Sequence, residues 1–372
     1  AGGPVIDDAR DRGPLMAIRV LVCDDSPLLR RVIGDMLAES GIEVVGQARD
    51  GVDVVTQAKA LRPDVITLDV EMPRRNGLDA LRILMKECPT PVVMVSSLTG
   101  EGTVATVDAL ASGAVEAICK PAIGISKDGW GDTCAELLRA VQAAAASRVV
   151  SPAGPGAKAP APARPGAALA GRAGGAGGPL VVIACSTGGP RALQSLMANL
   201  PARLGAGVLI VQHMPVGFTA SLAKRLGEVS PLEVREAAED DAIRPDRALL
   251  ARAGTHLELK RRDRVRLSHA PAIGALRPRA DITFQSAVEH HGANIVAVVL
   301  TGMGDDGLIG CAAVRAAGGR VLVEDESTAV VWGMPGSVAK AGHADVVLPL
   351  GALSLAITEA VAVASRRGAS GR

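Results

Sequence analysis

Residues 180–190 read LVVIACSTGGP, an apolar run that ends at two hydroxyl residues and two glycines. The run has the length and the aliphatic composition of a buried strand, and the Gly188-Gly189-Pro190 step is typical of a turn that starts a helix. A strand that leads through a sharp turn into a helix opens a βαβ unit, the unit that builds parallel sheets. The stretch therefore predicts an α/β fold in which Ser186 stands at the turn, close to helix N–H groups.

The same alternation of short β-branched runs with amphipathic segments continues on both sides of this stretch. After it, we expect strands at 208–212, 294–300 and 320–323. Before it, we expect strands at 18–23, 43–47, 64–68, 91–95 and 115–119, separated by helices. Residues 231–268 have a shorter pattern, which predicts one or two hairpins, one of them 257–260 with 265–267. Both halves are therefore predicted to be α/β, the first with a five-stranded parallel sheet and the second doubly wound with a mostly parallel sheet.

A Pro-, Gly- and Ala-rich segment separates the two halves. Residues 149–179 have a composition that cannot bury enough apolar surface to become ordered, so we interpret them as a flexible linker. The linker joins a domain at 17–148 to a domain at 180–367, with short tails at 1–16 and 368–372. A chain of 372 residues has room for two domains with full-sized cores.

The composition excludes several classes of protein. The 40 Lys and Arg residues against 39 Asp and Glu leave a formal charge of +1, which provides no overall field for attracting nucleic acid. No apolar run reaches the roughly 18 residues that span a bilayer, so we expect no membrane insertion. The six cysteines are scattered without metal-type pairs, which suits a reducing compartment. We therefore expect a cytoplasmic protein that does not bind nucleic acid.

Polar residues follow the strands of the first half, where the ligand site of a parallel sheet lies. Asp24 and Asp25 follow the first strand and Asp69 the third, while Ser96 and Lys120 follow the fourth and fifth. Carboxylates that meet at one sheet edge repel one another unless a cation joins them, and such oxygen ligands suit Mg²⁺. A carboxylate can also accept a phosphoryl group. We therefore predict that Asp69 is phosphorylated, that Asp24, Asp25 and Asp69 bind Mg²⁺, and that Ser96 and Lys120 bind the phosphoryl group.

A serine, a histidine and two acids lie at strand ends of the second half. Ser186 follows its strand, His213 ends the next one, and Asp305 and Asp306 follow a later one. A serine hydroxyl becomes nucleophilic when an imidazole removes its proton and a carboxylate orients that imidazole. Spacing alone leaves the choice between the two acids open. It also leaves open a binding module whose glycine turn grips a phosphate without covalent chemistry.

Two further histidines, His256 and His269, are more weakly placed, and we interpret them as structural or surface residues.

The first half resembles the response-regulator receiver domain. The resemblance rests on the motifs Val22-Cys23-Asp24-Asp25-Ser26, Leu68-Asp69-Val70-Glu71-Met72-Pro73 and Cys119-Lys120-Pro121. It implies a flavodoxin-like fold and a histidine kinase as the phosphodonor. Receivers commonly carry an aromatic residue three positions before the lysine, and this chain has Ala117 there.

The second half resembles the chemotaxis protein-glutamate methylesterases. The resemblance rests on the motifs Ser186-Thr187-Gly188-Gly189-Pro190, Gln212-His213-Met214-Pro215, Arg277-Pro278, Gly302-Met303-Gly304, Asp306-Gly307 and Gly333-Met334-Pro335. It implies that Ser186, His213 and Asp306 are the catalytic triad. The turns at Thr187 and Met303 are the candidates for the backbone donors to the oxyanion.

The combined resemblance implies a phosphorylation-controlled esterase that mediates sensory adaptation. Its substrates are expected to be glutamate methyl esters on methylated chemoreceptors, with deamidation of receptor glutamines as a second activity. The esterase chemistry is expected to need no cofactor, whereas phosphorylation of the receiver needs Mg²⁺.

Overall fold

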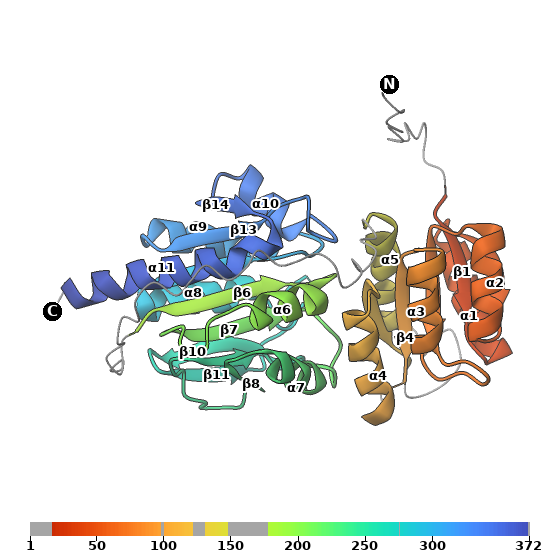
Figure 1. Cartoon of the computed structure of the whole chain (residues 1–372), viewed down its shortest axis with the longest axis horizontal. Helices are drawn as coiled ribbons and strands as arrows, with labels where there is room; N and C mark the ends of the chain where they lie inside the picture. Colours follow the sequence, from red (N-terminus) through yellow and green to blue (C-terminus); the bar gives the residue numbers. More distant parts are fainter. Residues whose placement is uncertain (1–16, 98–99, 122–130, 148–177, 275, 371–372) are drawn as a thin grey trace, which may run out of the picture.

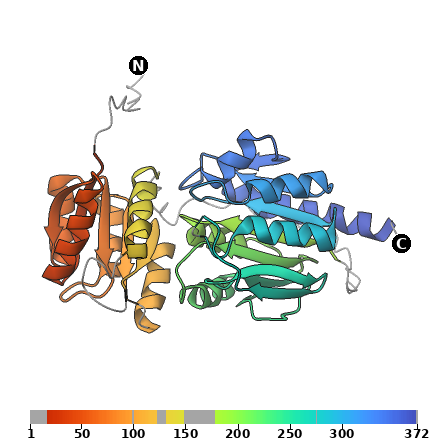
Figure 2. The same cartoon turned by 180° about the vertical axis from the view of Figure 1, so that it is seen from behind.

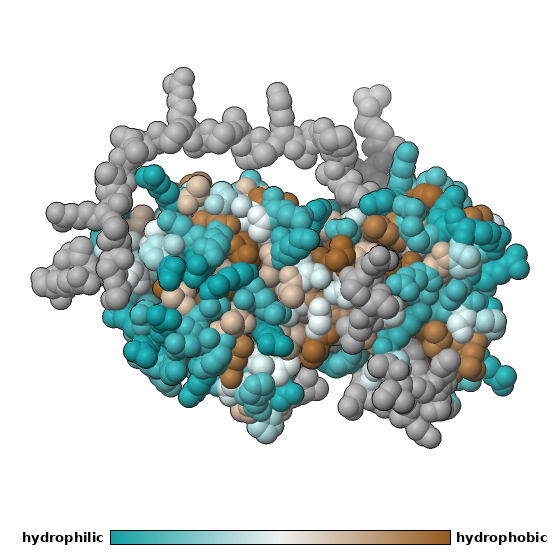
Figure 3. Space-filling model, turned by 90° about the horizontal axis from the view of Figure 1, so that it is seen from below, coloured by the Kyte–Doolittle hydropathy of each residue, from teal (hydrophilic) through white to brown (hydrophobic). Residues whose placement is uncertain are grey.

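The computed structural model describes residues 17–97, 100–121, 131–147, 178–274 and 276–370. These residues form two α/β domains that lie side by side (Figure 1, Figure 2). The expected tail at 1–16 lies outside the described residues, as does the expected linker except for residues 178 and 179. On the face shown in Figure 3, hydrophilic residues cover most of both domains. In the described part of the chain, no helix is both long enough and apolar enough to cross a membrane.

The first domain has the predicted five-stranded parallel sheet, and its strand order is β2-β1-β3-β4-β5. Its strands are β1 (Arg19–Cys23), β2 (Glu43–Ala48), β3 (Val65–Asp69), β4 (Val92–Ser96) and β5 (Glu116–Cys119). Its helices are α1 (Pro27–Glu39), α2 (Gly51–Leu61), α3 (Gly77–Glu87), α4 (Gly100–Ala111) and α5 (Gly131–Ala145).

Side-chain caps start three of these helices. Ser26 accepts a hydrogen bond from the N–H of Leu29 at the start of α1, and Asp50 and Asn76 cap α2 and α3 in the same way. Helices α1 and α5 cover one face of the sheet, and α2, α3 and α4 cover the other. The strands are therefore buried on both sides, which is why they read as continuous apolar runs.

The second domain has a seven-stranded sheet in which every pair of neighbours is parallel, with the order β14-β13-β12-β6-β7-β9-β8. Its strands are β6 (Leu180–Cys185), β7 (Gly207–Gln212), β8 (Glu233–Glu236), β9 (Arg247–Leu250), β12 (Ile295–Val299), β13 (Arg320–Glu324) and β14 (Val346–Leu348). Its helices are α6 (Gly189–Ala198), α7 (Thr219–Val229), α8 (Ala280–His291), α9 (Leu308–Ala316), α10 (Met334–Lys340) and α11 (Leu350–Ser370).

The predicted hairpin is confirmed, since β10 (His256–Arg261) pairs antiparallel with β11 (Arg264–Ser268) in a sheet of their own. The expected strands of the second half appear as β6, β7, β12 and β13. Strands β8, β9 and β14 were not predicted. Each has only three or four residues, and the two edge strands β8 and β14 alternate or expose their side chains instead of forming a buried run.

Two layers of helices complete the core of the second domain. Helices α6, α7 and α11 pack on one face of the sheet. Helices α8, α9 and α10 pack on the other face together with the β10–β11 hairpin. The last helix, α11, continues to Ser370, beyond residue 367 where we expected the domain to end.

The two domains touch through α4 and β5 of the first domain. Helix α4 packs against α6 and α7, and Val107 of α4 is buried in the core of the second domain. The carbonyl of Val115, just before β5, accepts a hydrogen bond from the N–H of Gly188 at 3.1 Å. The first domain therefore lies directly on the turn that follows β6.

Gly310 of α9 lies against α8 so closely that a methyl group would not fit. A Cβ there would lie 2.5 Å from the Cβ of Phe284, a fully buried residue of α8. We expect Gly310→Ala to lower the free energy of unfolding by about 1–3 kcal/mol, because α8 and α9 would have to move apart. Chemical denaturation of the full chain, followed by circular dichroism, measures this change.

The matched control is Gly351→Ala in α11, where an added Cβ meets no atom within 4 Å. This variant should unfold at the same denaturant concentration as the unmodified chain, or slightly higher. Equal midpoints for the two variants would contradict the close packing of α8 on α9.

Candidate active site and phosphoacceptor site

Three carboxylates meet at the carboxyl edge of the first sheet. Asp24 follows β1, Asp25 is next to it, and Asp69 is the last residue of the neighbouring strand β3. One oxygen from each of the three lies within 4.8 Å of the others. This is the grouping that the sequence predicted, and its oxygen ligands fit a small hard cation.

Lys120 neutralises part of this negative charge. Its Nζ lies 2.8 Å from Asp24 Oδ2 and 2.8 Å from Asp69 Oδ1. Burial raises the pKa of Asp69 to about 6, and the ammonium of Lys120 opposes the rise. Ser96 is buried at the end of β4, between the strands that carry Asp69 and Lys120. The structure thus brings all five predicted residues to one sheet edge.

Gly77 is a feature of this site that was not predicted from the sequence. A Cβ at Gly77, the first residue of α3, would lie 2.0 Å from the carbonyl oxygen of Asp69. Only glycine lets the start of α3 approach the backbone of Asp69 so closely. The sequence feature that could have indicated Gly77 is its position eight residues after Asp69, an acid that follows a predicted strand.

Ser186 stands at the sharp turn between β6 and α6. Its N–H donates to the carbonyl of Thr301 at 3.0 Å, and its carbonyl accepts from Gly189 at 2.7 Å. Gly188 has φ +77°, a conformation that favours glycine. The turn is therefore tied both to α6 and to the loop after β12.

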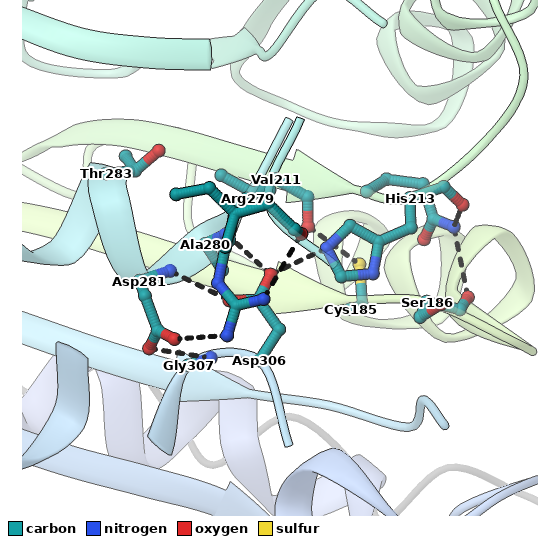
Figure 4. Close-up of polar contacts among 12 residues, drawn as sticks. Cys185, Ser186, Val211, His213, Arg279, Ala280, Asp281, Thr283, Asp306 and Gly307 are labelled. Atoms are coloured by element: carbon teal, nitrogen blue, oxygen red, sulfur yellow. Dashed lines mark hydrogen bonds and ion pairs between the residues drawn. The ribbon is translucent and has the colours of Figure 1, made fainter. Parts of the chain in front are cut away.

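His213 follows β7, the neighbour of β6, and faces Asp306 (Figure 4). Its Nε2 lies 2.8 Å from Asp306 Oδ2. Gln212 links the two strand ends, because its Nε2 donates to the carbonyls of Ser186 at 3.0 Å and His213 at 2.6 Å. In the described part of the chain no hydrogen bond joins Ser186 Oγ to His213, whose Nδ1 is the ring nitrogen not bonded to Asp306.

Asp306 is held by the first N–H groups of α8. Its Oδ2 accepts from Ala280 at 2.7 Å and its Oδ1 from Asp281 at 3.0 Å. Burial alone would raise the pKa of Asp306, but the hydrogen bonds from His213 and from these N–H groups outweigh burial and lower it. Asp305 is exposed whereas Asp306 is buried. The geometry therefore distinguishes the two acids that the spacing alone could not.

The loop after β12 lies against the nucleophile turn. A Cβ at Gly302 would lie 2.9 Å from the Cβ of Ser186. In the part of the chain that the structure describes, we find no hydrogen bond from the backbone N–H of Thr187 or of Met303. Neither N–H group is therefore committed to an acceptor among these residues.

Glu324 supports this loop and was not identified from the sequence. It is fully buried at the end of β13, and its Oε2 accepts from the N–H of Thr301 at 2.8 Å. Burial raises its pKa to about 7. An acid at the end of the apolar run Val321–Val323 was the signal that could have indicated it.

The two histidines interpreted as structural or surface residues lie away from Ser186 in the polar contacts that the structure gives them. His256 is buried, and its Nδ1 accepts a hydrogen bond from the N–H of Arg279 at 3.2 Å. His269 is exposed.

Two families match the chain. The family described as CheB methylesterase matches residues 181–357, and the family described as response regulator receiver domain matches residues 20–124.

Relatives named protein-glutamate methylesterase/protein-glutamine glutaminase match nearly the whole chain. The relative from Symbiobacterium thermophilum is 46% identical over 92% of this chain and 97% of its own length. The relative from Thermotoga maritima is 42% identical over 89% of this chain and 95% of its own length. Among solved structures, the Thermotoga maritima CheB methylesterase catalytic domain is 43% identical, with a TM-score of 0.48, and covers 49% of this chain and 98% of that one.

The two family matches and the two relatives span both domains, in the same order as the two sites described above. The chain therefore belongs to the protein-glutamate methylesterase/protein-glutamine glutaminase family, with a receiver domain in front of the methylesterase domain.

Proposed function

We propose that this chain is a phosphorylation-controlled carboxylesterase that removes methyl groups from glutamate side chains of chemoreceptors. Deamidation of selected receptor glutamines is its second activity, and both serve sensory adaptation. The observation that carries the proposal is the convergence of Ser186, His213 and Asp306 at the ends of β6, β7 and β12, with a 2.8 Å contact between the last two. The names of the relatives supply the substrate class.

In the proposed reaction, Ser186 Oγ attacks the carbonyl carbon of the γ-methyl ester. His213 removes the hydroxyl proton and then returns it to the methoxide that leaves as methanol. Because Asp306 holds Nε2 of His213, Nδ1 is the nitrogen that serves Ser186. Water then attacks the acyl carbon with His213 again as the base, the bond to Ser186 Oγ breaks, and His213 returns the proton to Oγ as the glutamate is released. Hydrogen bonds of this kind are often long before substrate binds and shorten in the complex.

The tetrahedral intermediates carry a negative oxygen that needs hydrogen-bond donors. The N–H groups of Thr187 and Met303 are our candidates, since the Gly302 loop lies against Ser186. A donor of this type is worth roughly 10²- to 10³-fold in rate in other hydrolases. Nucleophile, base and oxyanion donors all come from the chain, so the proposed esterase mechanism uses no cofactor.

In the receiver domain, Asp69 is the proposed phosphoacceptor and a histidine kinase of the chemosensory system the phosphodonor. Ser96 donates a hydrogen bond to a phosphoryl oxygen, and Lys120 pairs with the same group. Asp24, Asp25 and Asp69 would hold Mg²⁺, since each can offer an oxygen ligand within 4.8 Å of the others and such oxygens suit this cation. When bound, Mg²⁺ supplies positive charge next to the phosphoryl oxygens.

The proposed control acts through the contact between the domains. Glu116 of β5 accepts a hydrogen bond from the hydroxyl of Thr187 at 2.7 Å, and Val115 accepts one from Gly188. A receiver in this position restricts the approach of a receptor helix to Ser186. Phosphorylation of Asp69 would shift an existing equilibrium towards forms in which this contact is broken, and a tenfold activation needs only about 1.4 kcal/mol.

Replacement of any triad residue should abolish most of the activity. Ser186→Ala, His213→Ala and Asp306→Asn are each expected to reduce methanol release by roughly 10³-fold or more, because triad residues act as a unit. Asp305→Asn is the matched control and should retain activity, since Asp305 is exposed. A severe loss in Asp305→Asn together with an active Asp306→Asn would show that the wrong acid has been assigned.

Phosphorylation of Asp69 should depend on Mg²⁺. Labelling from a small phosphodonor is expected to stop in excess EDTA and to need more Mg²⁺ in Asp25→Asn, which loses an anionic oxygen ligand. Asp35→Asn in α1, an exposed acid away from the site, is the control and should behave like the unmodified chain. Undiminished phosphorylation in excess EDTA would overturn the metal assignment.

Removal of the receiver should release the esterase from control. We expect a fragment that begins at Leu180 to be active without phosphodonor, and full-length Asp69→Asn to stay at the low basal rate with or without it. Full-length Glu116→Ala should have a raised basal rate, because it loses the hydrogen bond to Thr187. A fragment no faster than the unphosphorylated full chain would mean that the receiver helps to build the active site.

A further inference from the structure

Arg279, the residue before α8, lies between two buried carboxylates (Figure 4). Its Nε lies 3.5 Å from Asp306 Oδ1, and one of its terminal nitrogens lies 3.1 Å from Asp281 Oδ2. The side chains of Asp306 and Asp281 are 1% and 6% exposed, and that of Arg279 is 16% exposed. All three charges therefore interact in a place that water screens only weakly.

The two carboxylates cap the starts of two helices reciprocally. Asp306, just before α9, accepts from the first N–H groups of α8, which has no capping side chain of its own. Asp281, in the first turn of α8, accepts from Gly307 at 2.9 Å and Gly310 at 2.8 Å at the start of α9. The arrangement fixes the position of Asp306, but it also brings two negative charges together.

Like charges at this distance disfavour ionisation of both groups. Burial raises the pKa of Asp281, and the charge of Asp306 adds to the rise, while Arg279 opposes it. Asp306 has to stay ionised to orient His213 and to stabilise the imidazolium that forms during the reaction. A positive charge next to the pair therefore adds to the hydrogen bonds from His213 and from the N–H groups of α8, which already favour the ionised form of Asp306.

The other titratable groups around the pair do not supply that charge. His256 of β10 directs Nδ1 to the backbone N–H of Arg279 and Nε2 to the carbonyl of Pro271, so both ring nitrogens have backbone partners instead of a carboxylate. Cys311 of α9 is buried near both carboxylates, and burial and their charges hold the pKa of its thiol far above the usual range. His213 approaches Asp306 from the end of β7, and it must be neutral to act as a base.

We propose that Arg279 is a positioning residue of the triad, whose guanidinium is the shared counter-ion that keeps Asp306 ionised beside Asp281. Its charge then sets the lower end of the pH range in which Ser186 is nucleophilic. The proposal rests on the proposed function, because it acts through the Ser186–His213–Asp306 triad. A guanidinium suits this role because its planar fork presents separate N–H donors to two acceptors.

The test compares the pH dependence of Ser186 reactivity among charge variants of the full-length, unphosphorylated chain. The measured quantity is the rate constant for labelling by a serine-directed fluorophosphonate, followed from acidic to neutral pH. Arg279→Gln should move the acid limb of this profile up by about one pH unit, because loss of a nearby cation favours protonation of the His213–Asp306 pair. Well below the limb, labelling should then be about tenfold slower than in the unmodified chain.

Two further variants separate a charge effect from a structural one. Asp281→Asn keeps an oxygen that can accept from the N–H groups of α9, but it removes a negative charge. The acid limb should therefore move to lower pH. The double variant Arg279→Gln/Asp281→Asn restores the balance, and its limb should return close to that of the unmodified chain. A disturbed fold cannot produce opposite shifts that cancel. Arg320→Gln, which removes an exposed charge at the start of β13, should leave the profile unchanged.

Each outcome decides the proposal. The proposal would be overturned if the acid limb of Arg279→Gln were unchanged. It would also be overturned if the limb of the double variant were shifted as far as that of Arg279→Gln. If Arg279→Gln does not fold, Asp281→Asn decides alone, since a limb that stays in place contradicts the shared counter-ion. Failure of the proposed function looks different, because labelling at Ser186 would then be absent from the unmodified chain or equally fast in His213→Ala.

Discussion

The carboxylate of Asp306 links the segments that form the candidate active site. It accepts hydrogen bonds from two N–H groups at the start of α8, and it contacts His213 at the end of β7. Asp306 also follows the loop that places Gly302 against Ser186. The strand order β12-β6-β7 sets Ser186 on the middle strand, with the acid from one side and the imidazole from the other. Because all three strands are parallel, their carboxyl ends lie at one edge, and side chains more than 90 residues apart in the sequence meet there.

Features set by short sequence patterns could be predicted, and features set by distant contacts could not. The fully buried strands and the residues that follow them were evident, because a parallel sheet covered on both faces requires continuous apolar runs. Strands β8 and β14 were not, since an edge strand leaves half of its side chains in water and its short pattern resembles a loop. The choice between Asp305 and Asp306 needed either the family resemblance or the burial that tertiary structure provides.

The supporting residues of the site escaped sequence analysis for the same reason. Arg279 follows a proline and looks like an ordinary surface cation, and its role depends on the reciprocal capping of α8 and α9. Glu324 ends an apolar strand, where a carboxyl is costly unless it has partners. The hydroxyl of Thr328 is a local partner, but the N–H of Thr301 comes from the loop after β12, 23 residues away in the sequence. Ala117 at the usual aromatic position of a receiver belongs to the core cluster against which Met214 of the catalytic domain packs. A small residue there suits a β5 strand that adjoins the second domain.

The most direct measurement is methanol release from membranes that carry methylated chemoreceptors, with the full-length chain added in the presence and absence of a small phosphodonor. It tests the substrate and the control in one assay, with Ser186→Ala protein as the background. The account predicts methanol release above that background, and a faster rate when phosphodonor and Mg²⁺ are present. Release no greater than that with Ser186→Ala protein under both conditions would contradict the claim that this chain is a phosphorylation-controlled receptor methylesterase.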